Sequence, residues 1–344
     1  MKAKPTADET STSAEPTHAR HSPRIRHIFV PIDFSEASLG ALDYALALAG
    51  PTGATITLLH VLEPGFVAGA MGSPPDTHGV DHSSDPQIMA DRLHTFAQTK
   101  IPAPHLGGSL VSTGPAGPTI AEIARQRGAD LIVVATHGYS GLTRAFLGST
   151  AEYLVREGPC PVLAARRPVM TSGTHGNRPG REIKSILVPM DLSEPSLHSF
   201  AYAEGLARQL NADLTLLHVV PALTVPQGTP MEESQLNLHA AEGAEVKLQE
   251  IADHGDGQVS RTATKVVMGE AGEEITRVAG DLGSDLLVVA THGRGGLQRA
   301  VLGSTAENIL RHAPCPVLVV RRPDTATTSW LTPPLFFPVA PFTP

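Results

Sequence analysis

A glycine-rich turn that leads into a helix start occurs twice in the chain and could bind an anion. The apolar run Leu131–Ala135 is followed by Thr-His-Gly, and nine residues later Gly148–Thr150 opens a helix. Glycines let the backbone approach a ligand closely, and the unpaired N–H groups and dipole of a helix N-terminus suit a phosphate. Gly303–Thr305 repeats the pattern. A tight structural turn with a helix cap is the alternative interpretation.

An aspartate follows the first apolar run of each half. Asp33 follows Ile28–Ile32, and Asp191 follows Ile186–Met190. An aspartate at the carboxyl end of a strand can accept hydrogen bonds from a ribose hydroxyl or an amino group, although capping of the next helix is equally open. Ligands of open α/β sheets bind beyond the carboxyl ends of the strands, where the strand order reverses. These aspartates are therefore candidates for the same cleft as the glycine turns.

The chain consists of two copies of one unit. The 24 residues that begin at Ala129 match those that begin at Ser284 at 18 positions. Equivalent residues are 155 positions apart in this block but 158 apart upstream, as for Asp33 and Asp191. One copy therefore carries an insertion, which we expect in a loop. Two units also agree with a length of 344 residues, at about 150 residues per domain.

Each copy is predicted to alternate strands with helices, which implies right-handed crossovers and a parallel doubly wound α/β sheet. The strands expected in the first copy are Ile28–Ile32, Thr55–Val61, Ser109–Ser112, Leu131–Ala135 and Val162–Ala165. Those of the second are Ile186–Met190, Asp213–Val220, Thr262–Val267, Leu286–Ala290 and Val317–Val320. Ser35 is the expected N-cap of the first helix, which Gly50 and Pro51 should stop. Further helices are expected over Ile88–Lys100, Thr119–Gln126 and Thr150–Arg156.

These elements define two domains, 25–166 and 182–322, joined by a linker over 167–181. Residues 1–24 are polar, and we expect this segment to be disordered. The segment 323–344 has no charge after Asp324 and holds Trp330 with three of the nine phenylalanines. Such a tail can dock on a partner groove or on the protein's own surface, and disorder is the alternative.

Composition excludes several classes of protein. Two cysteines cannot form a disulfide framework, and the N-terminus has no apolar signal segment. The clean apolar runs are far too short for a membrane span. A net charge of −8 argues against a nucleic-acid partner. We therefore expect a cytoplasmic protein that interacts with neither nucleic acid nor membrane.

Other polar residues have both structural and chemical interpretations. His137 and His292 lie at the mouth of the proposed site and could contact phosphate or act as acid–base groups, although a structural role is favoured. His60 and His218 should be packed and hydrogen-bonded in strands. Arg144 and Arg299 either neutralise phosphate or face solvent. Cys160 and Cys315 should be buried apolar residues. One further set of polar residues could suggest a metal site: Asp76, His78, Asp81, His82 and Asp85. Because their spacing fits no standard metal site, a polar loop is favoured.

In order and sequence, these motifs resemble those of a tandem universal stress protein of the UspA family. The shared features are V-P-I-D and V-P-M-D at the first strand, L-L-H-V at the second, and P-C-P-V before the fifth. The family's ATP-binding signature is G-x-x-G, nine residues, then G-[ST]. It fits Gly138 with Gly148-Ser149, and Gly293 with Gly303-Ser304, except that Ala135 and Ala290 replace its first glycine. The resemblance covers about residues 26–166 and 183–321.

The resemblance implies five-stranded sheets of order 3-2-1-4-5, of the adenine-nucleotide α-hydrolase-like type, with ATP and Mg²⁺ held between the first and fourth strands. Adenine and ribose contacts would come from Pro31, Asp33 and Val61 in the first half, and from Pro189, Asp191 and Val219 in the second. Ribose and phosphates would be held by Ala135, Gly138, Gly148, Ser149 and Thr150, and by Ala290, Gly293, Gly303, Ser304 and Thr305.

The function so implied is a stress-response nucleotide sensor or regulator that is not an enzyme. A slow ATPase or phosphotransferase and an interaction protein with relic pockets are the alternatives. No Walker-type loop or lysine is placed to reach the β/γ-phosphates, which weighs against the enzyme. We also expect the halves to form an internal pseudo-dimer, related by a pseudo-two-fold axis, with their fifth strands near the interface. A homodimer of such chains and an unknown protein partner are further expectations.

Overall fold

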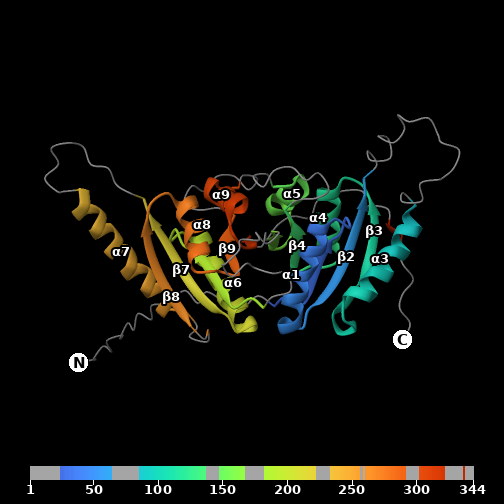
Figure 1. The fold of residues 1–344 in the computed structure, drawn as a ribbon, viewed down its shortest axis with the longest axis horizontal. Helices are drawn as coiled ribbons and strands as arrows, with labels where there is room; N and C mark the ends of the chain where they lie inside the picture. Colours follow the sequence, from blue (N-terminus) through green and yellow to red (C-terminus); the bar gives the residue numbers. More distant parts are fainter. Residues whose placement is uncertain are drawn as a thin grey trace, which may run out of the picture.

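A computed structural model describes residues 24–63, 85–136, 147–166, 182–221, 233–255, 259, 261–291, 302–321 and 336–337. Its two α/β halves share one sheet of eleven strands (Figure 1). The strand order is β11-β3-β2-β1-β4-β5-β10-β9-β6-β7-β8. Each half therefore has the order 3-2-1-4-5, and the predicted fold class is confirmed.

The first half alternates strands and helices as the sequence predicts. Its elements are β1 (His27–Pro31), α1 (Glu36–Thr52), β2 (Thr55–Leu62), α3 (Pro86–Lys100), the short helix η3 (Ala103–His105), β3 (Leu106–Thr113), α4 (Ala116–Gln126), β4 (Leu131–Ala135), α5 (Ser149–Glu157) and β5 (Val162–Ala165). All neighbouring strands within this half are parallel.

The second half repeats this plan. Its elements are β6 (Ser185–Pro189), α6 (Glu194–Leu210), β7 (Asp213–Val220), α7 (Glu233–Asp253), β8 (Thr262–Met268), α8 (Ala271–Asp281), β9 (Leu286–Ala290), α9 (Ser304–His312) and β10 (Val317–Val320). A last short strand, β11 (Phe336–Phe337), pairs antiparallel with β3 of the first half. Within the described part of the chain, no helix has the length and apolar character needed to cross a membrane.

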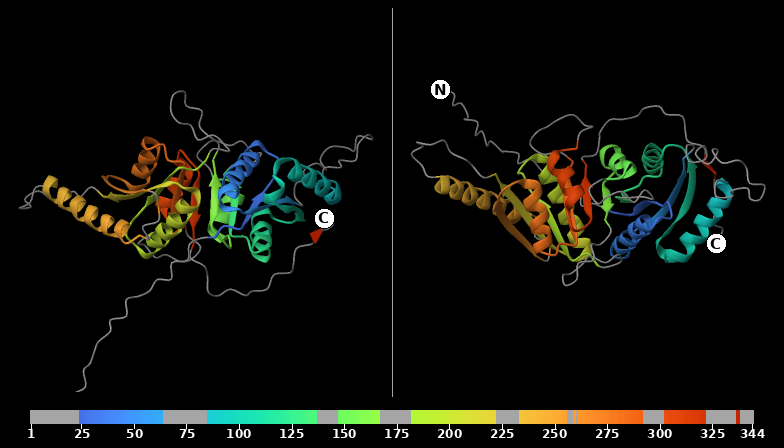
Figure 2. Two further views of the ribbon diagram at one scale, coloured as in Figure 1. Left: turned by 90° about the horizontal axis from the view of Figure 1, so that it is seen from below. Right: turned by 45° about the horizontal axis from the view of Figure 1, so that its top comes forward.

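Helices cover both faces of the sheet (Figure 2). Buried residues of α1, α3, α6 and α7 pack on one face, and those of α4, α5, α8 and α9 pack on the other. Strands covered on both sides need apolar residues at consecutive positions. This explains the unbroken run Leu131–Ala135 and its counterpart Leu286–Ala290, of which all but the last residue are buried.

The two halves meet where β5 and β10 pair antiparallel. Leu163 lies opposite Leu318, its own equivalent in the second copy, and both side chains are buried. The flanking pairs are Val162 with Val319 and Ala164 with Val317. This register exchanges equivalent positions about Leu163 and Leu318, so the predicted pseudo-two-fold relation is present in the sheet.

Arginines from each half reach the end of a helix in the other half. The Arg166 guanidinium donates to the carbonyl oxygens of Arg311 and Ala313 at 2.5 and 2.7 Å, at the end of α9. Its equivalent, Arg321, donates to the Gly158 carbonyl at the end of α5, at 3.5 Å. Carbonyls in the last turn of a helix lack intrahelical donors, and the dipole there favours a cation. These arginines therefore join the halves beyond the β5–β10 pairing.

Helix α1 does not stop at Gly50 and Pro51, so that prediction is wrong. The helix continues to Thr52 and ends at Gly53, whose φ of 70° is left-handed and whose N–H donates to the Ala49 carbonyl. Proline lacks the N–H that would bond four residues back, but one missing bond in the last turn does not break the helix. The left-handed glycine cap decides the end.

The predicted insertion lies between β2 and β3. His60 pairs with Val111 across β2 and β3, and the equivalent pair in the second half is His218 with Val266. The first members of these pairs are 158 positions apart and the second members 155. The three additional residues therefore belong to the first half's connection between its second and third strands.

Candidate functional site

The first and fourth strands of each half are adjacent but separate towards their carboxyl ends. β1 pairs with β2 over all five of its residues, but with β4 only at Ile28 and Phe29. In the second half, β6 pairs with β9 only at Ile186 and Leu187. The strand order reverses at this place, which is where open α/β sheets bind ligands. The pairing thus stops before the strand ends that carry Pro31 and Ala135, and we call the place between these two ends the crevice.

A constrained turn holds the predicted aspartate at the end of β1. The Ser35 N–H and hydroxyl both donate to Oδ1 of Asp33, at 2.9 and 2.6 Å. Ser35 is itself the N-cap of α1 and accepts from the N–H of Ser38. Asp33 therefore does support the helix cap, as the structural interpretation proposed. The same bonds fix the direction of a carboxylate at the crevice.

The residue after each aspartate has a left-handed backbone. Phe34 has a φ of 62°, and Leu192 has a φ of 63° beside Asp191. The Ser193 N–H and hydroxyl bond to Oδ1 of Asp191 at 3.0 and 2.5 Å, as in the first half. A bulky residue in this conformation costs about 1–3 kcal/mol, and such strain concentrates at functional sites. The sequence gives no sign of it, because neither residue is glycine or asparagine.

The second-strand histidines support the same turns. Nδ1 of His60 lies 2.6 Å from the Ile32 carbonyl oxygen, and Nδ1 of His218 lies 2.5 Å from that of Met190. A carbonyl only accepts, so Nδ1 carries the proton and donates. Burial lowers the pKa of His60 from its usual value. The interpretation of both histidines as packed and hydrogen-bonded is confirmed.

The amides of Gly148 and Gly303 are paired, which corrects the expectation that they are free for a ligand. The Gly148 N–H donates to the Thr136 carbonyl at 2.7 Å, and Gly303 makes the equivalent bond to Thr291 at 3.3 Å. Thr136 is held in turn by its own N–H, which donates to Ala165. Thr136 and Thr291, which follow β4 and β9, therefore lie against the starts of α5 and α9. These threonines are positioning residues that we did not predict, although both occur in the repeated A-T-H-G motif.

The amides that follow these glycines remain suited to an anion. Gly148 and Gly303 are the N-caps of α5 and α9, and neither has a side chain that could accept from the first turn. The N–H groups of the first turn of a helix have no intrahelical acceptor. In α5 they belong to Ser149 and Thr150, and in α9 to Ser304 and Thr305. In each half, the contact between the glycine and the threonine holds the helix start beside the end of the fourth strand, at Ala135 or Ala290.

Gly303 has no conformational reason to be glycine. Its φ of −63° and ψ of 146° are available to any residue. Among the described residues, the atom nearest to a Cβ built there is the Thr291 carbonyl oxygen, at 3.8 Å, an ordinary contact distance. Gly148 has nearly the same dihedral angles, −61° and 146°. Neither the backbone conformation nor the neighbouring atoms therefore require glycine here. A position without a side chain is suited to close approach by a ligand.

The remaining predicted residues are placed in part. Val61 and Val219 are half-buried in the second strands, and Pro31 and Pro189 end the first strands. Cys160 and Cys315 are buried free thiols whose pKa burial raises to about 12. Several predicted residues lie outside the described part of the chain: Gly138, Gly293, His137, His292, Arg144, Arg299, Asp76, His78, Asp81 and His82.

Asp85, the last member of the candidate metal set, is the N-cap of α3. Its carboxylate accepts from the N–H of Gln87 at 2.8 Å. Among the described residues, no three histidine, cysteine, aspartate or glutamate side chains gather as metal ligands. A magnesium ion at the crevice would thus rely on Asp33 or Asp191 together with the phosphates it accompanies, as Mg²⁺ usually does.

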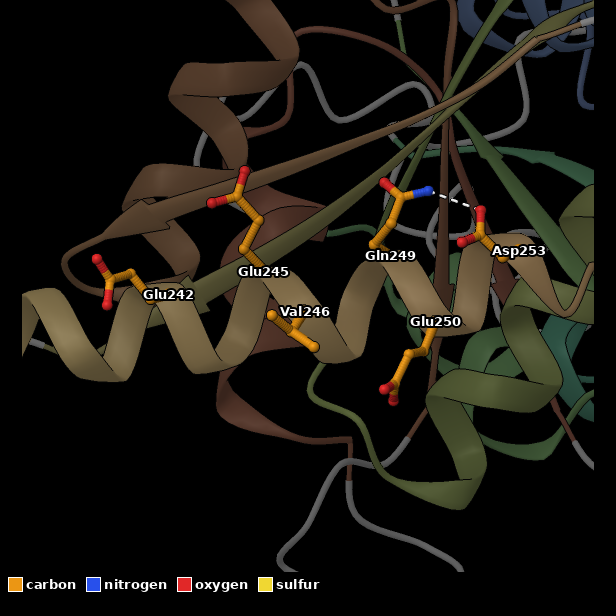
Figure 3. Close-up of a pocket in the computed structure, with 6 residues that line it drawn as sticks. All are labelled: Glu242, Glu245, Val246, Gln249, Glu250 and Asp253. Carbon is orange, nitrogen blue, oxygen red and sulfur yellow. Dashed lines mark hydrogen bonds between the residues drawn. The ribbon is translucent and has the colours of Figure 1, made fainter.

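A shallow hollow elsewhere on the surface does not fit a nucleotide. It lies along α7 and is lined by Glu242, Glu245, Val246, Gln249, Glu250 and Asp253 (Figure 3). Its four carboxylates would repel phosphates, and it contains none of the predicted site residues. The crevice between the first and fourth strands therefore remains the candidate site.

The fold defines a tandem pair of doubly wound α/β domains, in each of which the pairing of the first and fourth strands stops early at the switch point. The family model of the universal stress protein family matches residues 24–166 and 182–321. The chain therefore belongs to the universal stress protein family.

Several relatives are similar to all or to part of this chain. A universal stress protein of Mycobacterium tuberculosis is 26% identical over 305 residues, which cover 87% of this chain and 99% of the relative. One of Methanocaldococcus jannaschii is 32% identical over 144 residues, 41% of this chain and 83% of the relative. The crystal structure of an Archaeoglobus fulgidus universal stress protein has a TM-score of 0.60 and 19% identity, covering 88% of this chain and 98% of that one. This last likeness concerns the fold alone.

Proposed function

We propose that each half binds an adenine nucleotide in the crevice between its first and fourth strands, and ATP is the first candidate. The observation that carries the proposal is the early separation of β1 from β4, and of β6 from β9, beside a helix start without a side-chain cap. The nucleotide would regulate a stress response through the conformation of the tandem unit.

The crevice offers groups that can bind the ribose and groups that can bind the phosphates of such a ligand. The Asp33 carboxylate, fixed by Ser35, can accept hydrogen bonds from ribose hydroxyls. The first-turn amides of α5, at Ser149 and Thr150, can donate to phosphate oxygens. Gly138 and Gly293 stay part of the proposed phosphate site on the strength of the family signature. When bound, Mg²⁺ would neutralise phosphate charge.

We propose binding without appreciable turnover. The histidines of the second strands direct their Nδ1 protons to backbone carbonyls and brace the turn, so they do not act as acid–base groups through that nitrogen. A phosphate-release assay separates this proposal from slow hydrolysis. Phosphate release that is proportional to protein concentration and is lost in the Gly148→Ala and Gly303→Ala variants would contradict this proposal. The protein would then be an ATPase.

Calorimetry with ATP, AMP and cyclic AMP, together with mass spectrometry of any nucleotide that copurifies, tests the binding itself. We expect up to two adenine nucleotides per chain. No heat of binding at millimolar ligand, with no copurified nucleotide, would remove the proposal.

Gly303→Ala tests the position of the site in the second half. The new methyl group should occupy phosphate space and weaken binding there by about tenfold or more, equivalent to about 1.4 kcal/mol. Gly280→Ala is the matched control, because Gly280 lies on α8 and a Cβ there meets only Pro314 at 4.0 Å. Gly148→Ala should do the same in the first half. Unchanged stoichiometry and affinity in Gly148→Ala/Gly303→Ala would disprove the assignment.

Cytoplasmic location and a homodimer of the tandem unit belong to the same proposal. Cell fractionation and sedimentation equilibrium test them. Recovery of the chain in the membrane fraction would contradict the first, and a monomer across the micromolar range would contradict the second.

A further inference from the structure

The outer edge of the first half's sheet is covered by a piece of the chain that follows the second half. Phe336 pairs with Ser112 and Phe337 with Val111, antiparallel to β3. Without this partner, β3 would present unpaired backbone N–H and C=O groups at the end of the sheet. Figure 1 shows β3 and α3 on the side of the first half that is away from the second half.

The two outer edges of the sheet differ in the way they are protected. β3 (Leu106–Thr113) contains no charged residue and no proline, whereas β8 carries an exposed lysine, Lys265, in its middle. A lysine on an edge strand opposes pairing with another chain. The β8 edge is therefore built to face solvent, and the β3 edge needs a cover.

Burial differs in the same way at equivalent positions. Val111 and Ser112, which pair with β11, are 1% and 0% exposed. Their counterparts Val266 and Val267 in β8 are only half-buried. The halves share fold and register, but among the described strands only β3 has such a cover on its outer edge.

The chain is long enough to supply this cover from its own C-terminal side. Six strand spacings separate β10 from β11, which is about 29 Å across the sheet at about 4.8 Å per spacing. Sixteen residues lead from Val320 to Phe336, and an extended chain of that length spans about 50 Å. The same molecule can therefore reach the edge with length to spare.

We propose that the outer edge of β3 is a strand-addition site whose occupant is the chain's own segment at Phe336–Phe337, bound in cis. Main-chain hydrogen bonds hold an added strand of this kind, and side chains on alternate positions select it. The pairing places the segment beside Ser112, which is itself paired with Val61 of β2. The strand-addition site is thus separated from the crevice of the first half by β3, β2 and β1, and within the described residues no strand is added to the equivalent edge at β8.

Hydrogen exchange of the whole chain against a chain that stops after Arg322 tests the proposal. Amides of Leu110–Thr113 should exchange about tenfold faster or more in the shortened chain, because a paired edge opens less often. Amides of Val266–Met268 in β8 serve as the internal control and should not change. A synthetic peptide of residues 331–344, added to the shortened chain, should restore protection in proportion to its occupancy.

A second variant keeps the full length and removes the backbone donors. Phe336→Pro/Phe337→Pro cannot donate to β3 and should reproduce the fast exchange, whereas Thr328→Pro, outside β11, should not. Equal exchange in the whole chain, the shortened chain and the double proline variant would overturn the proposal. Protection that rises with protein concentration, with a dimer in sedimentation, would overturn binding in cis by showing that the occupant is a second copy.

Discussion

Asp33 has two tasks at the end of β1, and the structure explains how one residue performs both. Its Oδ1 receives two hydrogen bonds from Ser35, which start α1 in the correct direction. These bonds also hold the carboxylate at the crevice, where the family resemblance expects a ribose contact. The structural and functional interpretations of this residue are therefore compatible.

Substitutions of Asp33 should separate the two tasks. Asp33→Asn keeps an oxygen that accepts from Ser35, so we expect nearly unchanged stability but weaker nucleotide binding in the first half. Asp33→Ala removes both the acceptor for Ser35 and the carboxylate at the crevice. It should therefore weaken nucleotide binding and also destabilise the fold by about 1 kcal/mol, as loss of a capping acceptor does. Calorimetry and urea denaturation measure the two effects. Equal nucleotide affinity in wild type and Asp33→Asn would exclude Asp33 from the site.

His60 should make stability depend on pH in mildly acidic solution. Burial lowers its pKa in the folded state, with the nearby Arg92 charge acting in the same direction and Asp33 against it. Between this lowered pKa and about 6.5, the unfolded value, the unfolded chain binds a proton that the folded chain does not. The contribution of His60 to folding is therefore complete above that range and decreases as pH falls through it.

His60→Gln provides the measurement. Its side-chain amide does not titrate, so the stability advantage of the wild type over the variant should shrink as pH falls from 7.5 to 5. Denaturation curves at several pH values test this, and NMR titration of the His60 ring should give a pKa below the unfolded value. An advantage that stays constant with pH would contradict the assignment.

At the scale of elements, the ends of α5 and α9 depend on residues of the opposite half. Arg166→Ala should leave the carbonyls of Arg311 and Ala313 without their donor and cost about 1–2 kcal/mol. Arg321→Ala should cost less, because the bond to Gly158 is longer, at 3.5 Å. Urea denaturation of both variants gives the comparison. A larger loss in Arg321→Ala would contradict this order.

At the scale of the whole molecule, one continuous sheet joins the halves through β5 and β10. The register around Leu163 and Leu318 exchanges equivalent positions, so β5 is suited to pair with another β5. We expect a chain limited to residues 24–166 to form a dimer through this strand. Sedimentation equilibrium should show that dimer, and Leu163→Pro should make it monomeric, because proline cannot donate to the strand pair. A monomeric wild-type fragment would mean that the covalent link alone brings the halves together.

Local patterns were sufficient for most of the fold and for part of the candidate site. Consecutive apolar residues gave the buried strands, and Ser35 marked the start of α1, because both signals depend on neighbouring residues. The end of α1 was missed because Gly53, rather than Pro51, provides the left-handed cap. The pairing of the Gly148 amide was missed because its acceptor, Thr136, lies twelve positions earlier in the chain.

The sequence by itself determined that this chain is a repeat of two universal stress protein units, because repetition, apolar periodicity and motif order are properties of the chain alone. It also indicated Asp33, Gly148 and their equivalents as candidate site residues. Only the tertiary structure decided how the units join, since the β5–β10 register and the arginine contacts connect residues more than 140 positions apart. It also decided that β1 and β4 separate into a crevice and that β11 returns to the first half. These features arise from contacts between segments that are distant in the chain, which no local pattern of side chains records.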